Sequence, residues 1–173
     1  TYNYGTIEKN NALVDTNYNI IENNIGTINR YSSDVTLNEN SGTINTLSKG
    51  SVRKNTGKIN DVDDKNVTIY NYAGGTVGKS DNAWGVRACT VWNMGGIVQG
   101  YSSYADNVTV YNFEGGTVSN LRKGSVIYNL GGTVTDSSTA RVINCYKVNI
   151  NSSFVETWND KFIINPDTGE VWL

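Results

Sequence analysis

The chain of 173 residues contains no histidine, a single proline, a single methionine and two cysteines, and only 17 % of its residues are charged. The lack of histidine excludes Ser-His-Asp and Cys-His nucleophile systems and every histidine-ligated metal site. The net charge of −2 gives no electrostatic reason to expect binding to nucleic acid. We therefore expect no catalytic residues, no metal site and no cofactor.

Long hydrophobic runs are also missing. No apolar stretch reaches the ~18 residues that a membrane-spanning helix needs, and the sequence shows no signal peptide. We therefore expect no membrane insertion. Because the sequence opens at Thr1 inside a repeat-like segment, we expect it to be a piece of something longer.

What the chain does contain is a recurring Gly-Thr-aliphatic triplet. Its spacing of 15 to 21 residues indicates stacked repeats rather than a folded globule. Full copies begin at Gly5, Gly26, Gly42, Gly75, Gly116 and Gly132, and degenerate copies begin at Gly57 and Gly96.

The repeated unit is a short β-branched run, an Asn, a turn and a second short run. Val67–Asn71 followed by Gly74–Val77 is a clear copy. Such runs are too short and too β-branched for helices, and only Pro166 interrupts the chain. The pattern predicts an all-β fold, a single parallel β-solenoid of about eight short coils that rise by ~4.8 Å each.

The repeats predict two regions. Residues 1–150 form the solenoid, and residues 151–173 form a C-terminal capping segment, because an open end would expose strand edges. Within that segment Phe162–Leu173 is typical of a hairpin around an Asn-Pro-Asp-Thr-Gly turn, and Trp158 and Trp172 are placed to cover the last coil.

One asparagine recurs just before the corner of each coil. Stacked amides can donate and accept along a ladder, which predicts a structural role. The other interpretation is that asparagine simply favours turns. The residues at this position are Asn40, Asn55, Asn71, Asn93, Asn112 and Asn129.

A second column is aromatic. The strand period of two puts Ile69 on one face and Tyr70 on the other. We expect an outward ladder of aromatic rings beside a column of hydroxyls, which could bind sugar rings or a protein surface, with Trp92 offering the largest ring. Alternatively, the rings only stabilise neighbouring coils, or a loop covers them. The ladder comprises Tyr70, Trp92, Tyr111 and Tyr128, and the hydroxyl column comprises Thr68, Thr90 and Thr109.

Other candidate sites are weaker. Gly74–Ser80 ends in Gly-Lys-Ser but lacks the spacing of a phosphate-binding loop. The acidic cluster of Asp61, Asp63 and Asp64 lacks the further oxygen ligands of a calcium loop and is typical of a solvated loop. Cys89 and Cys145 fall about three coils apart, which is too far for a disulfide, so we expect free thiols.

The Asn-rich coils punctuated by Gly-Gly-Thr-Val resemble parallel β-helix proteins, in particular bacterial surface adhesin repeats and phage tail spikes or fibres. The likeness is architectural and covers about residues 1–150. It implies an extracellular, cell-surface or virion-borne rod that contacts glycans or host surfaces. The irregular coil lengths favour the right-handed form over the left-handed form.

Three functions are compatible with such a rod. The first is a non-enzymatic stalk and adhesion module, either a homo-oligomer or part of a longer chain. The second is a polysaccharide-cleaving solenoid enzyme, for which Asp106, Glu114 and Asp136 are candidate carboxylates. The third is an ice-binding solenoid, which needs a flat array of threonines that Lys58 and Ile97 interrupt.

Overall fold

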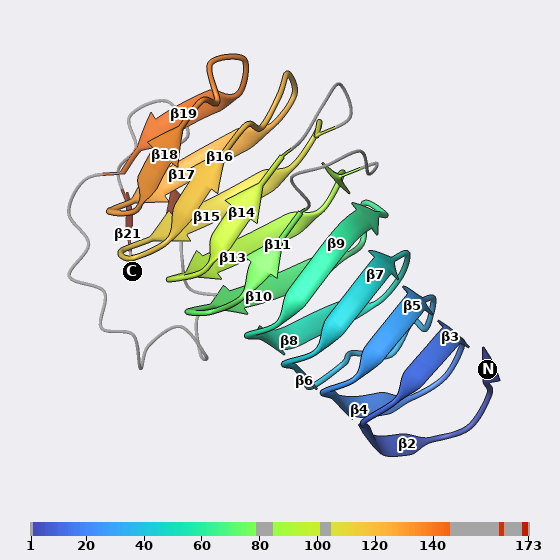
Figure 1. The fold of residues 1–173 in the computed structure, drawn as a ribbon. Coiled ribbons are helices and arrows are strands. Elements are labelled where there is room, and N and C mark those ends of the chain that lie inside the picture. Colours follow the sequence, from blue (N-terminus) through green and yellow to red (C-terminus); the bar gives the residue numbers. More distant parts are fainter. Residues whose placement is uncertain (1, 79–84, 101–104, 146–162, 165–170, 173) are drawn as a thin grey trace.

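The computed structural model describes residues 2–78, 85–100 and 105–145, together with the short strands 163–164 and 171–172. In this part of the chain every regular element is a β-strand, and the strands stack into a parallel β-solenoid of about eight turns (Figure 1). The all-β solenoid predicted from the repeats is therefore confirmed. No helix long and apolar enough to cross a membrane occurs among these residues.

Two parallel sheets form the walls of the solenoid, and each turn takes strands from both (Figure 1). Sheet A contains β1 (Tyr2–Asn3), β3 (Leu13–Asn17), β5 (Thr27–Tyr31), β7 (Thr43–Leu47), β9 (Lys58–Asp63), β11 (Thr76–Val77), β14 (Ile97–Gln99), β16 (Thr117–Ser119) and β18 (Thr133–Thr135), with β12 (Val86–Arg87) paired to β9. Sheet B contains β2 (Ile7–Asn10), β4 (Ile21–Asn24), β6 (Glu39–Asn40), β8 (Ser51–Asn55), β10 (Thr68–Tyr72), β13 (Thr90–Met94), β15 (Thr109–Phe113), β17 (Val126–Leu130) and β19 (Arg141–Asn144).

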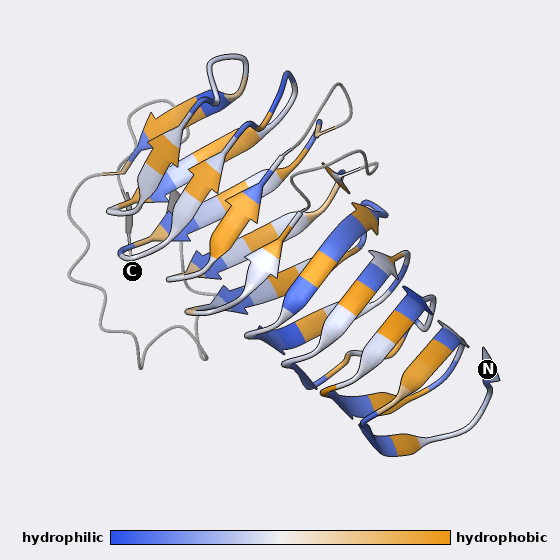
Figure 2. Ribbon diagram, in the orientation of Figure 1, coloured by the Kyte–Doolittle hydropathy of each residue, from blue (hydrophilic) through white to orange (hydrophobic). Residues whose placement is uncertain are grey.

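The core is a continuous aliphatic stack between the two sheets. On sheet B, Ile69, Val91 and Val110 lie in register and are fully buried. On sheet A, Val77 and Val98 form the matching column. Each such side chain stabilises the fold by about 1.5–3 kcal/mol relative to an exposed one. Figure 2 shows hydrophobic segments that recur on successive strands of the solenoid.

The strands of the two halves of sheet B differ by one residue. In β10 a single outward residue, Tyr70, separates the buried Ile69 from the buried Asn71. In β8 two exposed residues separate Val52 from Asn55, and the pairing register shifts between the two strands. A strict period of two therefore holds for the C-terminal coils only. Each N-terminal coil accommodates the extra residue by bending outward between its two inward positions.

Each glycine of the Gly-Gly corner has its own steric reason. Gly95 has a φ of 94°, which side chains rarely adopt. At Gly96 a Cβ atom would lie 2.2 Å from Nδ2 of Asn71 in the preceding coil. The corner therefore needs one glycine for the turn and a second because the asparagine amides approach the backbone closely.

The longest coil, from Asn71 to Asn93, contains an extra strand on the side of sheet A. Both β11 and β12 pair with β9, so one strand of the preceding coil carries two short strands of the next. A backbone hydrogen bond from Gly85 to the Asp61 carboxylate (3.0 Å) and an ion pair between Arg87 and Asp63 hold β12 in this place. Along the column of corner asparagines the coils measure 14 to 22 residues, slightly wider limits than the triplets indicate.

Part of the expected C-terminal hairpin is observed. β20 (Ile163–Ile164) pairs antiparallel with β21 (Val171–Trp172). Trp158, the turn at residues 165–170 and any capping of the last coil lie outside the described residues. The right-handed sense of the solenoid stays a prediction.

The second corner glycine gives a test of this packing. We expect Gly96→Ala to lower the free energy of unfolding by about 1–3 kcal/mol or more, because the new methyl group overlaps the buried Asn71 amide. Chemical denaturation monitored by circular dichroism measures the change. Gly5→Ala is the control, since its Cβ would meet nothing closer than 4.0 Å. Equal stability of the two variants would contradict the close approach.

Candidate functional site

An unbroken amide ladder runs along the inner edge of sheet B. Among the described residues nine asparagines stack at the same corner, and the side-chain nitrogen of each donates to the side-chain oxygen of the next at 2.7–3.3 Å. All six asparagines predicted from the sequence lie in it, and the structure adds three more. The members are Asn10, Asn24, Asn40, Asn55, Asn71, Asn93, Asn112, Asn129 and Asn144.

The amides also satisfy the backbone at the bend. Asn71 donates to the carbonyl oxygen of Ile97 at 3.2 Å, and Asn93 donates to that of Thr117 at 3.3 Å. Both asparagines are fully buried. Buried amides need such partners, because an unsatisfied polar group costs about 1–3 kcal/mol. The ladder is therefore a structural element that ties each coil to its successor.

The three members that the repeat alignment did not include carry the same signal. Asn24 stands before Ile25-Gly26 as Asn40 stands before Ser41-Gly42. Asn10 and Asn144 lie in register with Asn24 and Asn129, respectively. Alignment to the corner glycine alone would have found Asn24, whereas the other two depend on the pairing register.

A shorter ladder runs along the outer face of sheet A in the opposite direction. Asn60 donates to Asn45 at 2.8 Å, Asn45 donates to Asn29 at 2.8 Å, and Asn29 donates to the Asp15 carboxylate at 3.0 Å. These side chains are only partly buried. The outer face therefore presents polar groups at one-coil spacing whose orientation is already fixed by their neighbours.

The predicted aromatic column lies on the outer face of sheet B. Tyr70, Trp92, Tyr111 and Tyr128 are in register, with ring centroids 6.1, 4.2 and 5.1 Å apart in that order and planes within 19° of parallel. The three tyrosines are half-buried. Burial, and secondly the neighbouring Tyr128, raises the pKa of Tyr111, so its phenol remains protonated at neutral pH.

The expectation that Trp92 offers the largest open ring is wrong, because Trp92 is only 8 % exposed. Its ring is stacked against Tyr111 and also lies 6.1 Å from Phe113. Alternation along the strand correctly gives the outward direction of this side chain. It does not give exposure, which depends on the neighbouring rings.

The hydroxyl column beside the rings is also in register. Thr68, Thr90 and Thr109 pair directly along sheet B and are half-buried. The longer threonine column on sheet A is interrupted where Lys58 and Ile97 take the same position. Ile97 is 45 % exposed there, so the interruption lies on the open surface.

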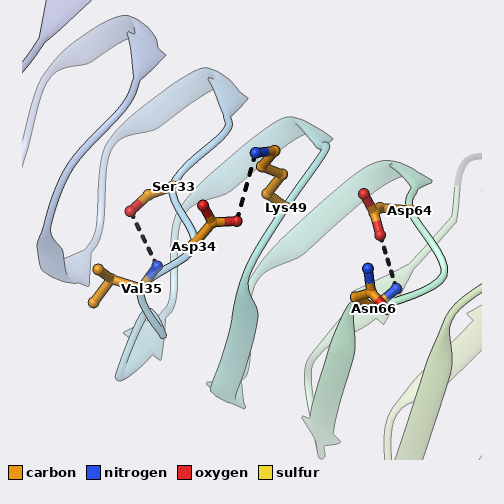
Figure 3. A network of polar contacts seen from close by, with 6 residues as sticks. All are labelled: Ser33, Asp34, Val35, Lys49, Asp64 and Asn66. Atoms are coloured by element: carbon orange, nitrogen blue, oxygen red, sulfur yellow. Dashed lines mark hydrogen bonds and ion pairs between the residues drawn. The ribbon is translucent and has the colours of Figure 1, made fainter.

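The candidate carboxylates are spread over separate contacts. Asp61 and Asp63 hold β12, and Asp64 accepts the backbone N–H of Asn66 at 2.8 Å. Figure 3 shows that contact together with the 3.6 Å ion pair between Lys49 and Asp34. No group of His, Cys, Asp and Glu side chains that could hold a metal ion is found in the part of the chain that the structure describes.

The carboxylates considered for glycoside cleavage do not form a pair across β15. Asp106 precedes this five-residue strand and Glu114 follows it. A strand of that length spans about 17 Å, whereas paired catalytic carboxylates lie about 5–10 Å apart. Asp136 follows β18 on the other sheet.

The two cysteines are free thiols, as predicted. Burial raises the pKa of Cys89 to about 12 and that of Cys145 to about 11. Both thiols therefore remain protonated near neutral pH and are poor nucleophiles. Of the rejected phosphate-loop motif, Lys79 and Ser80 lie outside the described residues.

Among the residues that the structure describes, the most exposed group of aromatic rings was not identified from the sequence. Tyr2, Tyr4 and Tyr18 are 64 %, 72 % and 50 % exposed, and their rings stack with centroids 5.3 to 6.5 Å apart. The available signal is the Asn-Tyr pair at Asn3-Tyr4, which recurs at Asn17-Tyr18. We call these three residues the tyrosine cluster.

An open polar depression lies on the outer face of sheet B near the same end. Its volume is about 360 Å³. Asn23 lies between Lys9 and Glu39 along the sheet, and because its side chain is shorter than theirs the surface is hollowed there. Ile25 and Ser41 also line the depression.

Comparison with known proteins adds no family. No protein-family model, curated protein or solved structure matches the chain.

The amide ladder predicts a large cost for removing one member. We expect Asn55→Ala to lower the free energy of unfolding by about 2–4 kcal/mol, because Asn40 loses its acceptor and Asn71 loses its donor inside the fold. Thermal and urea denaturation measure the loss. Asn38→Ala, at an exposed position two residues from Asn40, should change stability by less than about 0.5 kcal/mol. Similar losses in both variants would show that the ladder contributes nothing specific.

Burial of Trp92 predicts a stability effect as well. Trp92→Ala should lower the unfolding free energy by about 3 kcal/mol, since it removes a buried ring from the centre of the stack. Tyr18→Ala is the matched control, because that ring is 50 % exposed. A melting temperature of Trp92→Ala equal to that of Tyr18→Ala would mean that the ring does not pack as described.

Proposed function

We propose that the chain is a non-enzymatic stalk module of an extracellular, cell-surface or virion-borne protein, and that its outer face binds glycans. One observation carries this proposal: the coils stack in register, so the same side-chain type recurs at the same outer position in successive coils. Tyr70, Trp92 and Tyr111 show this on sheet B, as do Thr68, Thr90 and Thr109.

The stalk role is supported by hydrogen bonds that run from coil to coil. Parallel backbone pairing connects each strand to the next coil, and the amide ladder adds a buried side-chain bond at nearly every step. Repeats that contact only their neighbours form extended structures whose length grows with their number. Such a rod can hold a binding surface away from the body that carries it.

The glycan role is supported by the match between two periodic structures. A polysaccharide repeats the same ring along its length, and sheet B repeats a hydroxyl and an aromatic ring at each coil from β10 to β15. Sugar rings pack their C–H faces on aromatic rings, while threonine hydroxyls both donate and accept hydrogen bonds. Because Trp92 is buried, its ring stacks with Tyr70 and Tyr111 and does not face a ligand. The neighbouring threonine hydroxyls would then form the polar contacts with a bound sugar.

The test is glycan binding with a pair of nearly isosteric variants. Thr109→Val removes a half-buried hydroxyl from sheet B, and Thr117→Val removes an equally half-buried hydroxyl from sheet A. On an array of neutral and acidic glycans, we expect wild type and Thr117→Val to bind the same glycans. Thr109→Val should bind them about 3- to 10-fold more weakly, the value of one hydrogen bond.

Three results would contradict the proposal. The first is no binding to any glycan on the array. The second is equal weakening by both valine variants. The third is release of shortened chains from a bound polysaccharide, measured by reducing-end assay, which would favour the polysaccharide-cleaving alternative.

A further inference from the structure

The tyrosine cluster is a group of exposed, stacked aromatic rings that the first strand and the following coil build together. Tyr2 and Tyr4 flank Asn3 at the start of the chain, and Tyr18 lies beside Tyr4 because its N–H donates to the Asn3 carbonyl at 3.0 Å. The planes of Tyr4 and Tyr18 are within 11° of parallel, with ring centroids 5.3 Å apart. Tyr2 lies 6.5 Å from each of them.

Buried amides fix the backbone that carries these rings. Asn3 donates to Asn17 at 2.6 Å, and both side chains are at most 9 % exposed. The Asn3 oxygen also accepts the N–H of Gly5 at 3.0 Å, and Asn19 donates to the carbonyl of Tyr4 at 2.8 Å. These hydrogen bonds hold the backbone on both sides of Tyr4 in place, and none of them uses the Tyr4 ring. Because this backbone is already fixed, binding of a ligand would cost the protein little conformational entropy.

The groups around the rings are polar. One of them is charged: the Asp15 carboxylate lies beside Thr16 on the outer side of β3, which disfavours an acidic sugar. Thr16 pairs in register with Tyr2, and the Asn19 amide lies next to Tyr18 in the chain. With the three phenol hydroxyls they supply donors and acceptors at the rim of an apolar surface. This combination suits a ligand with a C–H face and hydroxyl edges.

The size of the patch distinguishes a small ligand from a protein partner. At roughly 200 Å² per aromatic side chain, the exposed fractions amount to on the order of 400 Å². A stable protein interface buries about 800 Å² on each partner. The cluster is therefore too small for a protein interface and large enough for one or two sugar rings.

We infer that the tyrosine cluster is a glycan-binding subsite that takes a neutral pyranose ring packed against the exposed surfaces of the Tyr4 and Tyr18 rings. The inference rests on the proposed glycan-binding function and gives it a location distinct from the threonine column of sheet B. Tyr2 extends the stacking surface, and Asn19 and Thr16 bond the hydroxyl groups at its edge.

The test is an NMR titration of the whole chain with tyrosine rings labelled with ¹³C. The probes are maltotetraose, cellotetraose and tetra-N-acetylchitotetraose, each neutral. We expect at least one probe to shift the ring signals of Tyr4 and Tyr18. Tyr4→Ala and Tyr18→Ala should each weaken its binding by about tenfold, as loss of an aromatic contact does, while Tyr18→Phe keeps the affinity within about threefold because the ring remains.

A control at the same end of the rod tests whether the contact is specific to the tyrosine rings. Leu13→Ala removes a different exposed apolar side chain (54 % exposed) and should leave sugar binding unchanged. Equal weakening by Leu13→Ala would indicate non-specific hydrophobic contact and overturn the inference. Ring shifts that depend on protein concentration without sugar would show self-association instead and also overturn it.

Failure of the subsite and failure of the proposed function give different results. If Thr109→Val weakens glycan binding and both tyrosine-to-alanine variants bind like wild type, the cluster is not a subsite and the function of sheet B stands. If no probe shifts the tyrosine rings, the inference is wrong whatever the array shows. Intact melting curves of the alanine variants establish that lost binding reflects the removed ring.

Discussion

The buried amide ladder is the interaction on which the rest of the structure depends. A solenoid must bend its chain sharply in every turn, and each bend leaves backbone groups without strand partners. The asparagines satisfy those groups and one another at the same time, since Asn71 donates both to Asn93 and to the Ile97 carbonyl. This is possible only if successive coils remain in register. The ladder therefore fixes the register that the aliphatic core, which has no directional bonds, cannot fix by itself.

The ladder also determines which residues can occupy the corner. Gly96 has no side chain because the Asn71 amide occupies that space, and Gly132 is in the same position relative to Asn112. In the first half the corner is one or two residues shorter than in the second half. There Gly42 lies against the backbone of Ile25 and Gly26 instead. Except at Gly5, the glycine of the recurring Gly-Thr-aliphatic triplet thus marks a close contact between successive coils.

Much of the fold could be predicted because it is encoded by repetition. The triplets gave the coils, and the corner position gave six ladder asparagines without a structure. Local alternation failed where an extra residue, as between Val52 and Asn55, bends the strand. It also failed to give the burial of Trp92, which depends on rings of other coils. The tyrosine cluster was missed because Tyr4 and Tyr18 meet only through a 14-residue coil, shorter than the triplet spacing indicates.

The aromatic column of sheet B and the tyrosine cluster differ in how far their rings are exposed to solvent. In the sheet B column the central ring is enclosed, so its apolar area already contributes to folding. In the tyrosine cluster the rings stack but leave at least half of each side chain open, so their apolar area contributes little to stability and remains available for contact. The same device, an aromatic residue repeated in register, thus serves both purposes. Flanking rings alone do not decide which purpose it serves, because Tyr111 also has a ring on each side and stays half-buried. Trp92 is enclosed where a further ring, that of Phe113, lies beside the stack.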